Sequence, residues 1–167
     1  MYAWQFAKAQ HVAERNGWTR FVSMQNYYNL VYREEEREMI PLCIDQGIGL
    51  IPWSPLARGL LAGNRGPGGE KRTVRANNDE FGDSLYTEED FAVADAVVEV
   101  ATGKGVRPAQ VALAWLLSRP GLTAPILGAT KVEHLEDALG AVDVTLTDDE
   151  IKRVEEPYRP HGIRGHR

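Results

Sequence analysis

The sequence has one cysteine, no long apolar run and no cluster of basic residues. Cys43 cannot form an internal disulfide, and its apolar neighbours favour a buried structural thiol over a nucleophile. The apolar runs are far shorter than the roughly 18 residues that cross a bilayer. The net charge is −5 and the basic residues are scattered among acids, which gives nucleic-acid binding little support. These absences indicate a cytoplasmic protein that binds neither membranes nor nucleic acids.

The 167 residues fit one domain, and 43% hydrophobic and 26% charged residues are typical of a globular protein. Apolar periodicity, N-cap residues and glycine or proline stops predict helices that alternate with short strands. The predicted helices cover 2–15, 33–46, 87–102, 109–118, 132–139 and a short segment between Thr147 and Pro157; the predicted strands cover 21–25, 48–51 and 123–127. This alternation indicates parallel βαβ units. Because three strands would leave long open edges, we expect part of a larger α/β architecture.

Two segments each join a short apolar run to a polar turn that contains glycine. In residues 50–61 the turn follows a proline and includes Trp53 and Arg58; in residues 125–137 it passes through Gly128 into a helix. Turns of this form place ligand-binding groups at the carboxyl ends of parallel strands.

The rest of the chain offers two segments without regular structure. The loop 58–86 is long enough to indicate a functional or mobile segment. The end of the chain, 160–167, is expected to be a mobile tail. Residues 66–69 superficially resemble a phosphate-binding loop. They lack the preceding strand and the following Gly-Lys-Ser/Thr, so we interpret them as a flexible loop.

These segments resemble the aldo-keto reductase family. The matching stretches are 21–30, 53–59, 128–137 and 146–151, in the order of the family and over nearly the whole chain. The family fold is a (β/α)8 barrel, and the chain resembles its C-terminal half, with strands six to eight and their helices. It would form one partial barrel domain over 1–167, and Met1 would correspond to an internal methionine of a longer reductase. The implied activity of the complete barrel is NADP(H)-dependent reduction of aldehydes or ketones.

The resemblance also implies a set of cofactor-binding residues. Gln25 would bond the nicotinamide carboxamide, Trp53 would stack on the nicotinamide ring, and Thr130 would bond the 2′-phosphate at the start of a helix. The turn after Trp53 would line the pyrophosphate beneath the loop 58–86, and two residues of the last segment would border the adenine. The full set is Gln25, Trp53, Ser54, Pro55, Leu56, Ala57, Arg58, Gly59, Gly128, Thr130, Lys131, His134 and Asp137.

The chain departs from the family pattern around the adenosine. Ala138 stands where the family often places an asparagine against the adenine. The basic residue for the 2′-phosphate is not evident, and the candidates are Lys131, Lys71, Arg72 and Arg75. The preference for NADP over NAD therefore stays open.

Several of these residues also have an ordinary interpretation. Trp53 could be a core aromatic beside a proline, Gln25 could satisfy a backbone group, and His134 could be a solvated side chain. The histidines are not at metal-ligand spacing, so no metal site is predicted.

The family's catalytic aspartate, tyrosine, lysine and histidine come from the first half of the barrel, and none maps onto this chain. A tyrosine donates a proton near neutral pH only beside a cation that stabilises its phenolate. No lysine can be assigned from the motifs to Tyr27, Tyr28, Tyr32, Tyr86 or Tyr158. We therefore expect a cofactor-binding half that is inactive alone. The alternatives are a non-catalytic NADP(H)-binding regulatory module and a truncated fragment.

A half-barrel would also leave its strand edges and inner face open. We expect such a chain to associate with itself or with a complementary N-terminal half.

Overall fold

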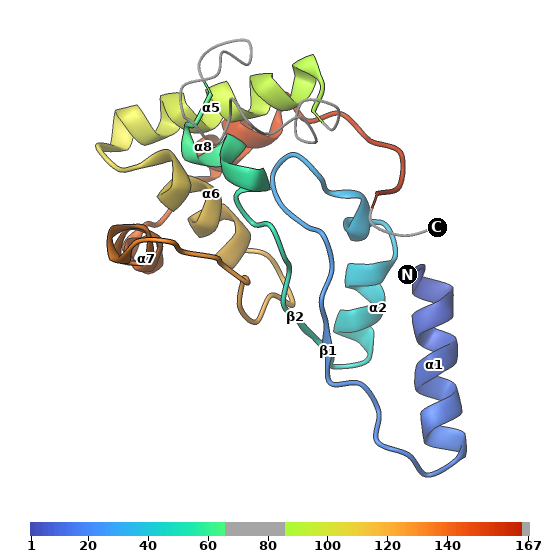
Figure 1. Ribbon diagram of the computed structural model, residues 1–167. Coiled ribbons are helices and arrows are strands. Elements are labelled where there is room, and N and C mark those ends of the chain that lie inside the picture. The colour runs from blue at the N-terminus through green and yellow to red at the C-terminus, as the bar shows by residue number, and fades with distance from the viewer. Residues whose placement is uncertain (66–85, 165–167) are drawn as a thin grey trace.

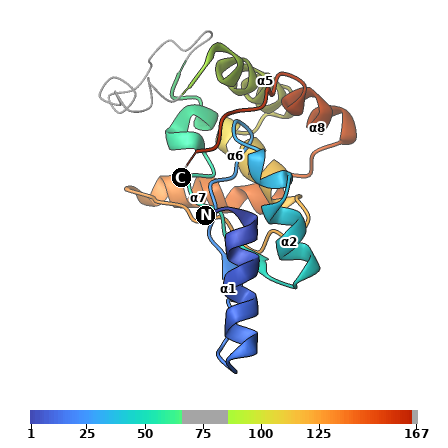
Figure 2. The same ribbon diagram turned by 90° about the vertical axis from the view of Figure 1, so that its right-hand side faces the viewer.

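The two short strands lie side by side between helix α2 and helix α6, with α1 outside α2 (Figure 1). The computed structural model describes residues 1–65 and 86–164. The elements in these ranges are α1 (Ala3–Arg15), β1 (Ser23–Met24), η1 (Glu34–Glu36), α2 (Met39–Asp45), β2 (Gly49–Leu50), η2 (Ala57–Ala62), α5 (Glu88–Lys104), α6 (Pro108–Leu117), α7 (Val132–Leu139), η4 (Gly140–Asp143) and α8 (Asp148–Glu155). The turned view shows α5 and α8 together at one end and α1 at the other (Figure 2).

The strands pair in parallel, as the alternation with helices predicts. Ser23 pairs with Gly49 and Met24 with Leu50, and the pairing continues as an isolated parallel bridge between Tyr27 and Trp53. Both strands are shorter than predicted. On the β2 side Pro52 has no N–H to donate to a ladder, which helps explain why the regular pairing stops at Leu50.

The predicted third strand, 123–127, is not formed as a regular strand. Only isolated parallel bridges join this part of the chain to β2, at Leu50 with Leu122 and at Trp53 with Ile126. The N–H groups of Thr123 and Ala124 both donate to the carbonyl of Leu50, at 2.9 and 3.4 Å. Pro125 follows and has no N–H. The segment 122–126 therefore runs parallel beside β2 with an interrupted ladder.

The predicted helices after residue 86 are confirmed, with ends within about two residues. Thr87 caps α5, its N–H donating to the carboxylate of Asp90 at 3.0 Å. Pro108 is the first residue of α6, where its missing N–H costs nothing. The capping box of α8 is also present, because the N–H of Thr147 donates to Glu150 at 2.8 Å and Thr147 accepts the return bond.

The predicted helix 33–46 is wrong as one continuous element. It is divided into the short helix η1 and the helix α2. Pro41 occupies the first turn of α2, and in a continuous helix its ring would clash with the carbonyl of Arg37. The division also leaves η1 free to direct its carboxylates toward the C-terminal part of the chain.

The core forms where α5 packs against α6, α8 and η2, and Met24 and Leu50 of the two strands belong to the same cluster. Its largest fully buried side chains include Trp115, Tyr28 and Tyr32. Cys43 is also fully buried, which agrees with the predicted structural thiol, and burial raises its pKa to about 11. The thiol therefore stays protonated at neutral pH.

Large apolar side chains remain exposed on several elements of the molecule. They include Trp4, Trp18, Phe21, Val22, Ile44, Trp53, Ile126, Val132, Leu135, Leu139 and Val142. On α7 the exposed apolar residues recur at i, i+3 and i+7, so they form one uncovered face. Within residues 1–65 and 86–164, none of the helices has the length and apolar character that a membrane crossing requires.

Candidate functional site

The candidate site is the carboxyl end of the parallel ladder, which we call the open ladder end and define as Gln25, Trp53 and Ile126. The N–H of Trp53 donates to the carbonyl of Asn26 at 2.9 Å, and the N–H of Ile126 donates to the carbonyl of Pro52 at 2.8 Å. All three side chains are exposed, and 39% of Trp53 is accessible. The fold thus brings residues from three distant parts of the sequence to one edge.

An aromatic stack supports Trp53 from one side. Its ring centroid lies 4.5 Å from that of Tyr27, with an angle of 23° between the planes. Tyr27 in turn stacks on Tyr32, at 4.7 Å and 26°. Both tyrosines are buried. Trp53 is therefore neither a core aromatic nor a free surface residue, because one side is packed and a large part is open.

The turn after Trp53 contains an unusual concentration of left-handed backbone. Ser54, Ala57 and Arg58 have φ angles of 51°, 46° and 56°, and Gly59 has a φ of 94°. A Cβ on Gly59 would come within 2.7 Å of the Asn64 side chain. Left-handed residues other than glycine cost free energy and cluster at functional sites. The strain therefore supports this turn as a binding element independently of the sequence motif.

Two side chains that the sequence did not single out hold this turn in place. The amide of Asn29 donates to the carbonyl of Ser54 at 3.0 Å, and the hydroxyl of Tyr86 donates to the carbonyl of Ala57 at 2.8 Å. Asn29 also accepts the N–H of Val31 at 3.0 Å. Because the partners are 25 and 29 residues apart, no local pattern could have revealed these contacts.

The second candidate segment follows Ile126 directly. Gly128, Thr130, Lys131 and His134 are all exposed, and Lys131 is the N-cap of α7. Their arrangement places a helix start within six residues of the open ladder end. Among the other candidates for phosphate binding, Lys71, Arg72 and Arg75 lie outside the described residues, as do residues 66–69.

Asp137, at the far end of α7, is tied to α6. Its carboxylate lies 3.1 Å from the guanidinium of Arg107, and its carbonyl accepts a hydrogen bond from Gln110 at 3.1 Å. Arg107 is largely exposed and was not among the residues picked from the sequence. A cation therefore stands beside the side chain that the resemblance assigns to the adenine.

The buried tyrosines hold their protons tightly. Burial raises the pKa of Tyr27, Tyr28, Tyr32 and Tyr158. Tyr28 donates to Glu36 at 2.7 Å and Tyr158 donates to Glu34 at 2.6 Å, and a hydrogen bond to a carboxylate raises the pKa of each further. A phenol whose pKa is raised is a weak proton donor at neutral pH.

Among residues 1–65 and 86–164, no three His, Cys, Asp or Glu side chains gather in a way that could hold a metal ion.

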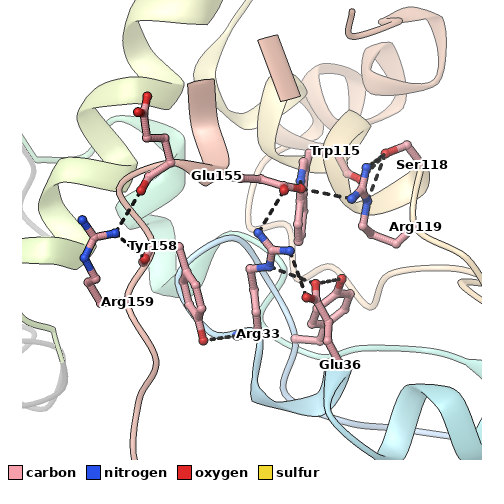
Figure 3. A network of polar contacts seen from close by, with 10 residues as sticks. Arg33, Glu36, Trp115, Ser118, Arg119, Glu155, Tyr158 and Arg159 are labelled. Carbon is pink, nitrogen blue, oxygen red and sulfur yellow. Dashed lines mark hydrogen bonds and ion pairs between the residues drawn. The ribbon is translucent and has the colours of Figure 1, made fainter. Parts of the chain in front are cut away.

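A network of polar contacts centres on Arg33 (Figure 3). Arg33 binds both oxygens of Glu36 at 2.9 Å and lies 3.2 Å from Glu155. Glu155 also accepts hydrogen bonds from the indole N–H of Trp115 at 2.7 Å and from Arg119 at 3.0 Å. We call these five residues the Arg33 cluster. Each charge in it has a partner, so the cluster is a structural joint between η1, α6 and α8.

Residues 161–164 contact α5, η1 and the segment just before η1. The imidazole of His161 lies 2.9 Å from the buried carboxylate of Asp90, and the N–H of Arg164 donates to the hydroxyl of Tyr32 at 2.9 Å. The N–H of His161 also donates to Glu34 at 2.9 Å. The segment thus has defined contacts where the sequence predicts a mobile tail over 160–167. Its mobility stays a prediction.

Comparison with known proteins points in one direction. The family model described as "Aldo/keto reductase family" matches residues 2–159. The chain is 49% identical over 167 residues to versiconal hemiacetal acetate reductase of Aspergillus parasiticus, covering 98% of this chain and 48% of that protein. It is 46% identical over 166 residues to an aldo-keto reductase of Alternaria alternata, covering 99% of this chain and 44% of that protein. The chain thus spans about half the length of the curated relatives it matches.

Proposed function

The chain belongs to the aldo/keto reductase family of oxidoreductases, and we propose that it forms the dinucleotide-binding part of an enzyme that reduces aldehydes or ketones with NADP(H). We further propose that it corresponds to the C-terminal half of a (β/α)8 barrel. The parallel run of β1, β2 and the segment 122–126 supports this, because it has the order and direction of barrel strands six to eight.

The observation that carries the proposal is the position of Trp53. It stands at the carboxyl end of the ladder between Tyr27 and Ile126, packed on one side and open on the other, immediately before the strained turn. In barrels of this kind the carboxyl ends of the strands build the binding site. An exposed indole with a fixed plane is suited to stacking on a flat heteroaromatic ring.

The other residues would bind the rest of the cofactor. Gln25, which is exposed directly after β1, would bond the carboxamide. The turn 54–59 would approach the pyrophosphate closely through its backbone. Thr130 and Lys131, at the start of α7, would meet the 2′-phosphate, where the helix dipole favours an anion. His134 and Asp137 would border the adenine. The predicted loop 58–86, which would cover the cofactor, begins within η2, and its residues 66–85 lie outside the described residues.

Bound NADPH supplies the hydride, and this chain would hold the nicotinamide for transfer. The proton would come from the other half of the barrel, because burial raises the pKa of Tyr27, Tyr28, Tyr32 and Tyr158, and Tyr28 and Tyr158 also donate to carboxylates. We therefore propose that the chain alone binds cofactor without turnover. Oxidation of NADPH with 4-nitrobenzaldehyde as substrate tests this, and steady turnover by the purified chain would refute it.

The test of binding compares two exposed tryptophans. Trp53→Ala should weaken NADPH binding about tenfold, a factor that corresponds to about 1.4 kcal/mol and matches the loss of one aromatic stack. Trp18→Ala is the control, because Trp18 is exposed in the connection that enters β1 at its amino end, whereas the open ladder end lies at the carboxyl end. Equal affinities of both variants and the wild type, measured by calorimetry, would exclude Trp53 as the platform. Titration with NADH in parallel decides between the two cofactors.

A second candidate function is a regulatory module that binds NADP(H) without chemistry. The packing of the Arg33 cluster into structural contacts favours it over an independent enzyme. Adding a complementary N-terminal barrel half separates the two functions. Turnover that appears on mixing supports the reductase, whereas binding that persists without turnover supports the module.

The exposed apolar residues of the ladder edge and α7 support self-association, or association with a complementary half. The single buried cysteine supports a cytoplasmic location.

A further inference from the structure

The packed side of Trp53 makes a contact with Tyr27 that the sequence motif of the cofactor site does not reveal. Tyr27 lies against the indole with ring centroids 4.5 Å apart and nearly parallel planes. The two residues are bridge partners in the ladder, so their backbones are fixed side by side. Only 5% of Tyr27 is exposed, against 39% of Trp53. Tyr27 therefore covers one face of the indole, and the open side of the indole faces away from Tyr27.

Tyr27 is itself held in place by packing on its other face. Tyr32 stacks on the far side of Tyr27 at 4.7 Å and is completely buried. Its hydroxyl accepts the backbone N–H of Arg164 at 2.9 Å, and His161 stacks beyond it at 6.3 Å. Tyr27 cannot move away from Trp53 without disturbing Tyr32 and the segment 161–164.

We propose, on the basis of the proposed function, that Tyr27 is a positioning residue that fixes the plane of Trp53 for recognition of the nicotinamide. An exposed tryptophan has two side-chain torsions, and freezing them on binding weakens affinity. The stack on Tyr27 fixes these torsions before the cofactor arrives. The benefit applies to a ligand that stacks on Trp53 and not to a ligand that binds only the turn and α7.

The experiment therefore uses two ligands that differ by the nicotinamide. Calorimetry measures NADPH and 2′-phospho-ADP-ribose, which keeps the phosphates and the adenine, on the wild type, Tyr27→Leu and Tyr27→Phe. Tyr27→Leu should weaken NADPH about fivefold and change the affinity for 2′-phospho-ADP-ribose by less than about twofold. Tyr27→Phe keeps the ring and should leave both affinities within about twofold.

Tyr28→Leu is the matched control. Tyr28 is an adjacent buried tyrosine that packs on Trp115 at 5.6 Å and not on Trp53. It should destabilise the fold and weaken both ligands equally if it weakens either. If Tyr27→Leu does not fold, Tyr27→Met takes its place in the same comparison.

The outcomes separate the two proposals. Loss of both affinities in Tyr27→Leu by the same factor, or of neither, would overturn the positioning role while leaving the cofactor site in place. A wild type that binds neither ligand would overturn the proposed function itself, and the positioning role with it.

Discussion

The Arg33 cluster and the open ladder end are built in opposite ways. In the Arg33 cluster, charges from η1, α6 and α8 are paired with one another and with Trp115, so the contacts of these side chains are complete within the chain. At the open ladder end, Gln25, Trp53 and Ile126 have their backbones paired and their side chains exposed. The first region uses its side chains for folding, and the second leaves them available for a ligand or a partner.

The contrast shows where a change will affect stability and where it will affect binding. When one partner of a half-buried ion pair is removed, the remaining charge is left uncompensated and partly desolvated, which destabilises the fold. An exposed side chain on a hydrogen-bonded backbone can be changed with little effect on folding. Among the residues that resemble the family's cofactor motif, six are exposed and lie in the second class: Gln25, Trp53, Gly128, Thr130, Lys131 and His134. Pro55 and Ala57 are buried in the turn, and Asp137 is paired with Arg107.

The largest expected effect is in the Arg33 cluster. Arg33→Ala should lower the free energy of unfolding by about 3 kcal/mol, because it leaves Glu36 without its cation, leaves Glu155 with Arg119 alone and removes the guanidinium from the Trp115 ring. Only 16% of the Arg33 side chain is exposed, against 64% of the Arg37 side chain, which pairs with Glu34. Arg37→Ala is therefore the control and should lower the free energy of unfolding much less, because water solvates the exposed guanidinium. Urea unfolding that gave equal losses would contradict the distinction between the two sites.

An intermediate effect is expected where η1 meets the end of the chain. Tyr158→Phe removes the bond to the Glu34 carboxylate and the bond that Tyr158 accepts from the N–H of Arg33, and should cost about 1–2 kcal/mol at neutral pH. Urea unfolding of Tyr158→Phe should show a smaller loss in a Glu34→Gln background, because the two residues share one interaction. An undiminished loss would show that Tyr158 acts through other contacts.

The stabilisation of the fold by the hydrogen bond between Tyr158 and Glu34 should depend on pH. Burial alone would raise the pKa of Glu34, but hydrogen bonds from Tyr158, the His161 N–H and Arg37 hold it below the usual range. A carboxyl with a lowered pKa stabilises the fold above its ordinary value, about 4.3, and this contribution is lost as the pH falls through the folded pKa. The difference between wild type and Tyr158→Phe should therefore narrow below about pH 4. A difference that is constant from pH 7 to pH 3 would contradict this assignment.

The smallest effect on folding is expected on the exposed face of α7. Leu139→Glu should change the free energy of unfolding by less than about 0.5 kcal/mol, because the Leu139 side chain is largely exposed and buries little apolar surface. It should instead reduce self-association, measured by sedimentation over a range of concentrations. Glu136→Gln, on the same helix, is the control and should leave association unchanged. A large loss of stability in Leu139→Glu would show that this face is already packed, and the comparison of the two regions would fail.

Helices were more predictable than strands. The bounds of α7 match the predicted range of 132–139. The first residues of α5, α6 and α8 follow from Thr87, Pro108 and Thr147. These signals are local, because a cap or a proline acts on the turn that contains it. The segment 123–127 looked like a strand but pairs only through isolated bridges, since pairing depends on a partner more than 70 residues away.

The candidate site divides in the same way. Trp53 and the turn 54–59 could be found from the sequence because they form one continuous motif. Asn29, Tyr86 and Arg107 could not, because each acts on a residue 25 to 30 positions away.

The sequence by itself determined the family and most of the helices, since each of these depends on short continuous stretches. It also indicated the residues that we propose to bind a cofactor. Only the tertiary structure decided that Tyr27 lies beneath Trp53, that the turn after it is left-handed at three residues other than glycine, and that Arg33 joins η1 to α6 and α8. The physical reason is that stacking, backbone strain and charge pairing depend on distances in space. Those distances are set by packing between segments that are far apart in the chain.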